Sequence, residues 1–126
     1  MRTVIVTIII LAIFILGAFV LHRYIDTSCE GLLENVKELH VSVEDDRWPD
    51  SKKQLSGLNK KWENTKKRWQ LFLEHYEMDD IDIVLSRLEQ YLEVEDKASA
   101  LSETAELRIL INHIKDKEGF MLENIL

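Results

Sequence analysis

The hydrophobic pattern of the chain changes once, near residue 22. Residues 3–21 form an unbroken uncharged run, whereas the residues that follow mix apolar and charged positions with a helical period. Nineteen residues at about 1.5 Å each would form a helix of about 28 Å, close to the ~30 Å hydrocarbon core of a bilayer. Ionisable side chains lie just outside the run, with Arg2 before it and His22 and Arg23 after it. The pattern therefore predicts that residues 3–21 span a membrane and contact its lipid.

A cleaved signal peptide is the alternative for this run. Such peptides have an apolar stretch of about 7–15 residues and a small-x-small cleavage site. Here the apolar stretch is longer, and the small residues Gly17 and Ala18 are followed by the bulky residues 19–21. Asp26, three positions before Cys29, also argues against a lipoprotein site. We therefore expect an uncleaved signal-anchor.

The expected organisation is a membrane anchor in residues 1–23 and one domain in residues 24–126, held at the cell membrane by a single pass. A short basic N-terminal tail usually stays inside the cell, which would place the C-terminal domain outside the cytoplasm. The basic residues on the two flanks are nearly balanced, so the sequence favours this orientation without fixing it.

Residues 24–126 are patterned as helices joined by short breaks. Pro49 is the only proline, and no stretch alternates apolar and polar residues as a strand would. Breaks at residues 44–49, 78–80 and 95–96 predict four amphipathic helices. Caps are expected from these residues: Thr27 with Glu30, Ser51 with Gln54, Asp79, and Asp96. We therefore expect an all-α protein, in which a transmembrane helix precedes a small antiparallel bundle of about four helices or two helical hairpins.

A heptad seam runs through the second predicted helix, which is expected to begin between Pro49 and Leu55 and to reach Tyr76. Its apolar positions alternate in steps of three and four, so they share one face. Four of them are aromatic: Trp62, Trp69, Phe72 and Tyr76. Aromatic platforms can bind sugars or cations, but this spacing favours core packing for all four residues.

The domain after the apolar run is strongly acidic. Only two of the 16 basic residues precede residue 26 and all 23 acidic residues lie at or after it, so residues 26–126 carry a net charge of −9. Such a domain is repelled by nucleic acid and by anionic headgroups. No His-Glu-x-x-His pattern, cysteine pair, calcium loop or glycine-flanked serine occurs either. We therefore expect no nucleic-acid binding, no metal, no cofactor and no enzymatic activity.

Glu118 is the most unusual ionisable residue, because it lies in the apolar register between Ile114 and Met121. A buried carboxylate needs a partner or a raised pKa. If the second and fourth helices are neighbours, His75 could reach Glu118 and form a buried polar pair with an acid–base role. The alternative is a glutamate at the edge of the core, paired with Lys115 or with solvent.

Two further features bear on association. Cys29 is the only cysteine and follows the anchor closely, so it could form a disulfide between two parallel chains or serve as a small buried apolar contact. The sequence is therefore compatible with a homodimer and does not require one. The last residues, 120–126, hold more apolar side chains than one helical stripe can bury. This tail could meet a partner or the bilayer face, or it could complete the core.

The chain resembles an uncharacterised family. The resemblance rests on Trp62 and Trp69 and on residues 71–82, 87–93 and 106–126. The family is the domain of unknown function 4363, which comprises small single-anchor membrane proteins of spore-forming Gram-positive bacteria. The resemblance implies a membrane-bound helical protein without an assigned activity, working beside multi-spanning membrane proteins. It brings no catalytic or binding residues.

The expected role is that of a membrane-anchored accessory or interaction protein, a subunit of a larger membrane assembly with a membrane-protein partner. The alternative is an envelope sensor or a module that binds a small ligand. A deep pocket that contains Glu118, His75 or an exposed tryptophan would favour ligand binding. A filled core with an apolar external surface would favour a protein partner.

Overall fold

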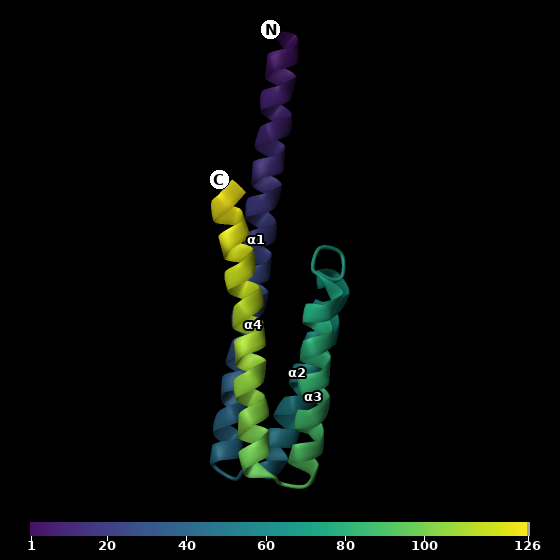
Figure 1. The fold of residues 1–126 in the computed structure, drawn as a ribbon, viewed down its shortest axis with the longest axis vertical. Helices are drawn as coiled ribbons and strands as arrows, with labels where there is room; N and C mark the ends of the chain where they lie inside the picture. The colour runs from purple at the N-terminus through teal and green to yellow at the C-terminus, as the bar shows by residue number, and fades with distance from the viewer. Residues whose placement is uncertain (126) are drawn as a thin grey trace.

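The computed structural model describes residues 1–125, and four helices account for most of them. The helices are α1 (Arg2–Glu44), α2 (Trp48–Trp69), α3 (His75–Glu93) and α4 (Lys97–Ile125). They run alternately down and up one axis, so that α1 lies beside α2 and α4, and α3 lies beside the same two helices (Figure 1). No strand occurs between residues 1 and 125. The prediction of an all-α bundle with a long apolar N-terminal helix is confirmed.

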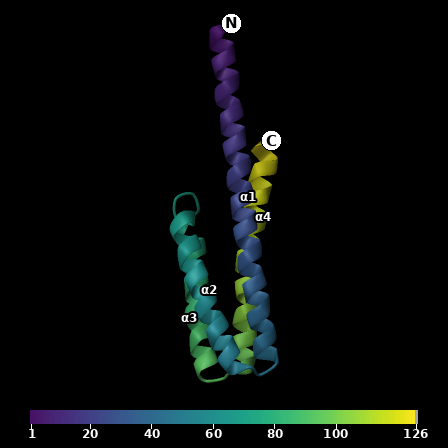
Figure 2. The same cartoon turned by 180° about the vertical axis from the view of Figure 1, so that it is seen from behind.

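Helix α1 passes from the apolar run into the bundle without a break. Its first part projects alone beyond the other helices, and burial begins at Ile25, which is 1% exposed (Figures 1 and 2). This helix is long and apolar enough to cross a bilayer. The capping box predicted at Thr27 and Glu30 is wrong, because a cap acts only where the backbone enters a helix and here the helix continues. The boundary expected at residue 23 therefore falls inside one helix.

The core is a single cluster built from all four helices. Its members recur at the heptad positions of each helix, which places one apolar seam of every helix on the bundle axis. The largest fully buried side chains include Trp62, Trp69, Leu32, Leu39, Met78, Leu88, Leu107 and Ile111. The two tryptophan rings meet edge to face, with centroids 5.7 Å apart at 82°. The prediction that Trp62 and Trp69 belong to the core agrees with this packing.

Helix α2 ends at Trp69 and not at Tyr76. The amide of Leu71 bonds to the carbonyl of Arg68 at 3.2 Å and that of Phe72 to Trp69 at 3.1 Å, so the last turn tightens to i→i+3 bonds and stops. Phe72 is 37% exposed and Tyr76 is 57% exposed, so both were wrongly assigned to the core. Their heptad spacing continues by coincidence across a loop, residues 70–74.

Of the capping predictions at Asp96, Ser51 and Asp79, the structure bears out one. Asp96 caps α4: its Oδ1 accepts from the Ser99 amide at 3.1 Å and its Oδ2 from the Ser99 hydroxyl at 2.7 Å. These bonds hold the pKa of Asp96 below its usual value. Ser51 is no cap, because it lies inside α2 and its hydroxyl donates to the carbonyl of Arg47 at 2.9 Å. Asp79 lies inside α3 and is no cap either.

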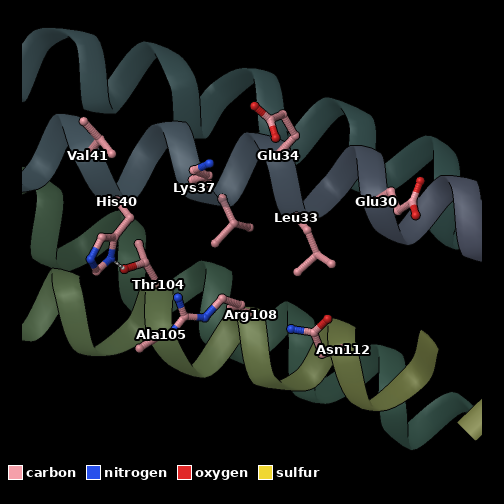
Figure 3. A pocket seen from close by; sticks show the side chains of 11 residues that line it. Glu30, Leu33, Glu34, Lys37, His40, Val41, Thr104, Ala105, Arg108 and Asn112 are labelled. Carbon is pink, nitrogen blue, oxygen red and sulfur yellow. Dashed lines mark hydrogen bonds between the residues drawn. The ribbon is translucent and has the colours of Figure 1, made fainter. Parts of the chain in front are cut away.

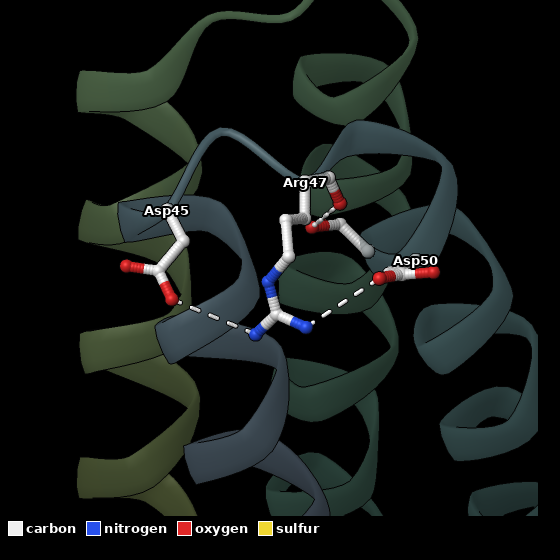
Figure 4. A network of polar contacts seen from close by, with 4 residues as sticks. Asp45, Arg47 and Asp50 are labelled. Atoms are coloured by element: carbon white, nitrogen blue, oxygen red, sulfur yellow. Dashed lines mark hydrogen bonds and ion pairs between the residues drawn. The ribbon is translucent and has the colours of Figure 1, made fainter.

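Helix α2 begins at Trp48, earlier than expected, because Pro49 fits the first helical turn, where no amide donor is required. The side chain of Arg47 bridges the preceding turn, with Nη2 3.6 Å from Asp45 and Nη1 3.4 Å from Asp50 (Figure 4). All three side chains are exposed, so these ion pairs add little stability.

Candidate functional site

A groove of about 660 Å³ runs between α1 and α4 on the outside of the bundle (Figure 3). It lies beside the core seam: Val36 and Thr104 are buried at its base, and its other residues occupy positions next to the buried heptad positions of the two helices. The residues from α1 are Glu30, Leu33, Glu34, Val36, Lys37, His40 and Val41. The residues from α4 are Thr104, Ala105, Arg108 and Asn112. None of the predicted site residues lines this groove.

The groove combines apolar walls with free charges. Leu33 from α1 and Ala105 from α4 both line it, Leu33 toward the Asn112 end and Ala105 toward the Thr104 end (Figure 3). Within residues 1–125, no ion pair involves Glu34, Lys37 or Arg108. An acidic and a basic group are therefore both available to a partner that covers the apolar part.

The end of the groove farthest from the N-terminus is closed by a polar network. Nδ1 of His40 lies 2.6 Å from the hydroxyl of Thr104, and that hydroxyl lies 2.8 Å from the carbonyl of Leu101. Nε2 of His40 lies 3.0 Å from the carboxylate of Glu44. This network joins α1 to α4 and places the hydroxyl of Thr104 beside the imidazole of His40. Thr104 is only 1% exposed, and its hydroxyl donates to the carbonyl of Leu101, so the network serves here as a link between the two helices. The apolar part of the groove, next to this network, can bind an apolar segment.

The predicted pair of His75 and Glu118 does not form. His75 is exposed at the first position of α3, and no hydrogen bond or ion pair in the described chain joins it to Glu118. Glu77 faces α4 in its place, since two residues correspond to about 200° around a helix. Glu118 itself is half-buried, and burial followed by the charge of Glu77 raises its pKa. His22 and Lys117 oppose that rise.

Glu77 and Lys117 form the polar contact that the sequence analysis missed. Nζ of Lys117 lies 3.1 Å from Oε1 of Glu77, whose side chain is only 4% exposed. The same nitrogen lies 3.8 Å from Glu74 and 5.9 Å from the ring centre of Tyr76. The bond to Glu77 raises the pKa of Lys117. A signal for this contact was present, because Glu77 falls on the same heptad seam as Ile81 and Val84.

We expect Glu118→Gln to raise the melting temperature by a few degrees near neutral pH. The folded-state pKa of Glu118 lies above its unfolded value, so the contribution of this group to stability is present at low pH and is lost as the pH rises through the folded pKa. Glutamine carries no charge that must be buried. Glu118 also loses its charge as the pH falls, so the gain in melting temperature should shrink at low pH. Melting curves against pH test this, with the exposed Glu123→Gln as the control; a gain that is independent of pH would contradict it.

The remaining candidates are structural. Trp62 is 2% exposed, so its ring offers no ligand platform. Its Nε1 donates to Asp82 at 2.7 Å, and Lys66 pairs with the other oxygen of that carboxylate. Cys29 is fully buried, and burial raises its pKa to about 12, which agrees with the apolar-contact interpretation. Among the residues that the structure describes, no group of three or more histidine, cysteine or acidic side chains could hold a metal ion.

Comparisons with known proteins assign the chain to a family without naming an activity. No curated protein and no solved structure matches the sequence. The family described as "Domain of unknown function (DUF4363)" matches residues 19–125, which cover the bundle from the end of the apolar run to the end of α4. The chain therefore belongs to the family of the domain of unknown function 4363.

Proposed function

We propose that the protein is a single-pass, membrane-anchored interaction subunit that binds another membrane protein through the groove between α1 and α4. The observation that carries this proposal is the continuity of α1, in which one helix holds both the exposed apolar run and one wall of the groove. The C-terminal bundle is proposed to lie outside the cytoplasm.

The exposed apolar run supports a retained anchor. Most large side chains between residues 4 and 21 are at least half exposed, whereas soluble proteins rarely expose apolar patches beyond a few hundred Å². Cleavage between residues 18 and 30 would cut one continuous helix and would endanger the contacts of Ile25 and Cys29 in the core. An anchor that stays attached is therefore more consistent with the fold than a removed signal peptide.

The direction of the groove supports a membrane protein as the partner. Because α1 and α4 run antiparallel along one axis, a helix that lies in the groove would run along α1 toward the bilayer (Figures 1 and 3). A transmembrane helix that continues out of the bilayer has this direction. Its apolar face would cover Leu33 and Ala105, and its charges would meet Glu34, Lys37 and Arg108.

A small-ligand or sensor role has less support. The void between Leu32, Trp62 and Ile111 in the core is only about 10 Å³, about the space of one water molecule. Both core tryptophans are buried, and neither Glu118 nor His75 lines the groove. The bundle is therefore filled, and its groove is on the surface.

Co-purification from native membranes tests the proposal. Tagged full-length protein with Val41→Glu and Ala105→Glu, which place charges in the groove, should recover a membrane-protein partner at least about tenfold less well than the wild type. Ile83→Glu on α3, where the side chain is also about half exposed (53%), is the matched control and should recover the partner normally.

All variants should keep their helical circular dichroism and stay in the membrane after an alkaline wash. Release of the wild type by that wash would contradict the anchor. Equal recovery by the groove variant and the control would contradict the groove, and recovery of a second, differently tagged copy alone would show a homodimer in its place.

A further inference from the structure

The end of the bundle nearest the apolar run carries exposed apolar side chains on two separate elements. The loop between α2 and α3 exposes Leu71 (85%) and Phe72 (37%), and the end of α4 exposes Phe120 (65%) and Met121 (50%). Both elements lie at the end of the bundle from which the N-terminal part of α1 projects (Figures 1 and 2). We call these four residues the anchor-proximal patch.

Two contacts fix the height of this patch along α1. The ring of Phe72 packs edge-on against Tyr24, with centroids 6.4 Å apart at 81°. Gly119 lies against His22, because a Cβ at Gly119 would be 3.6 Å from Cε1 of that histidine. Since α4 runs antiparallel to α1, Phe120 and Met121 continue from there toward the apolar run. The patch therefore lies level with the polar boundary at residues 22–24.

We propose that the anchor-proximal patch inserts into the surface of the bilayer that holds the anchor. This inference rests on the proposed function, because the proposed anchor sets the bilayer edge near His22. At that height the four side chains would meet the interface between headgroups and acyl chains, where aromatic and apolar groups are favoured over water. The lipid surface thus becomes a second binding partner, contacted by both halves of the bundle.

Exposed cations lie beside the α2–α3 loop part of the patch. Lys67 and Arg68 in the last turn of α2 and Arg23 on α1 are exposed, and none of them forms an ion pair within the described chain. Glu74 in the loop already pairs with Lys117, while Glu123 on α4 stays exposed. Asp79 and Asp80 near the start of α3 and Asp116 on α4 are also exposed and form no ion pair within the described chain, so this end presents free charges of both signs. Lys67 and Arg68 are the free charges closest in sequence to Leu71, and basic groups near the surface attract anionic headgroups.

Insertion at two points beside the anchor would also fix how the bundle stands on the membrane. A single helix allows the attached domain to tilt. The α2–α3 loop and the end of α4 would add two further contacts with the membrane on separate sides of the bundle, and these contacts would limit the tilt. The groove between α1 and α4 would then face sideways along the membrane plane, toward neighbouring proteins.

Site-specific labelling of the full-length protein in vesicles tests the proposal. Cysteines introduced by Leu71→Cys, Val94→Cys and Ala12→Cys would carry an environment-sensitive fluorophore, and the buried Cys29 with its raised pKa should not react. Val94 is a matched control, because it is also apolar and exposed (73%) and lies just after α3 at the opposite end. Lipids brominated in the acyl chain serve as the quencher.

We expect strong quenching at position 12, quenching at position 71 several-fold above that at position 94, and a further increase at position 71 when phosphatidylglycerol replaces part of the phosphatidylcholine. Lys67→Glu with Arg68→Glu should abolish that increase, and an increase that survives would overturn the role of these cations.

Equal, low quenching at positions 71 and 94 with strong quenching at 12 would overturn the inference and leave the anchor intact. Absence of quenching at position 12 would overturn the anchor itself. A blue-shifted label at position 71 without bromine quenching would show that protein covers the patch, which also overturns the proposal.

Discussion

Replacing Trp69 with alanine should lower the free energy of unfolding by about 3–5 kcal/mol. Trp69 is fully buried at the end of α2, where its ring meets that of Trp62 edge to face. Its indole nitrogen has no hydrogen-bond partner within the described chain, so the loss is one of packing alone. The effect is a large part of the 5–15 kcal/mol that stabilises a typical domain.

Urea unfolding of residues 22–126 measures this effect, because every buried core residue lies within that fragment. Trp48→Ala is the matched control: Trp48 only packs against the edge of the core, and we expect a cost of about 1 kcal/mol. A Trp69→Ala fragment with nearly wild-type stability would contradict the core assignment and would reopen the ligand-platform interpretation.

Replacing Lys117 with methionine should lower the free energy of unfolding by about 2–3 kcal/mol. The change keeps much of the apolar stem but removes the cation from Glu77, whose carboxylate is only 4% exposed. Removing one partner of a buried ion pair typically costs about 3–5 kcal/mol. We expect less here because Lys117 is 30% exposed, so water can screen part of the remaining charge.

The neighbouring Lys115 provides the control. It has a similar exposure of 29%, but it pairs with Asp26 and Glu30, which are more exposed than Glu77. Lys115→Met should therefore cost less than about 1 kcal/mol. Adding Glu77→Gln to Lys117→Met should restore at least half of the lost stability, because it removes the unpaired charge. A double variant no more stable than Lys117→Met would show that the lysine acts through packing.

The groove and the patch lie at different positions along the axis of α1. The groove starts at Glu30 on α1, whereas the patch lies level with residues 22–24. Substitutions in one surface should therefore leave the other unchanged, since distant sites without shared partners act nearly independently. This separation allows partner binding and lipid contact to be tested one at a time.

Local patterns in the sequence determined the class of the fold. The uncharged run of residues 3–21, the seam that buries Trp62 and Trp69, and the Asp96 cap each depend on residues within a few turns of one another. Such signals follow from the helical period and from backbone hydrogen bonding, and a single chain displays them completely. The four helices were predictable for this reason, although their ends were less so.

Only the tertiary structure decided where α2 stops and which polar groups meet. The heptad spacing continues through Phe72 and Tyr76, yet the chain turns at residue 70. Glu77 and Lys117 are 40 residues apart in sequence, and the sequence analysis instead paired Glu118 with His75. The groove likewise exists only because α4 returns beside α1. Helical periodicity shows which face of a helix is buried, but it does not specify the neighbour that covers this face or the register between the two helices.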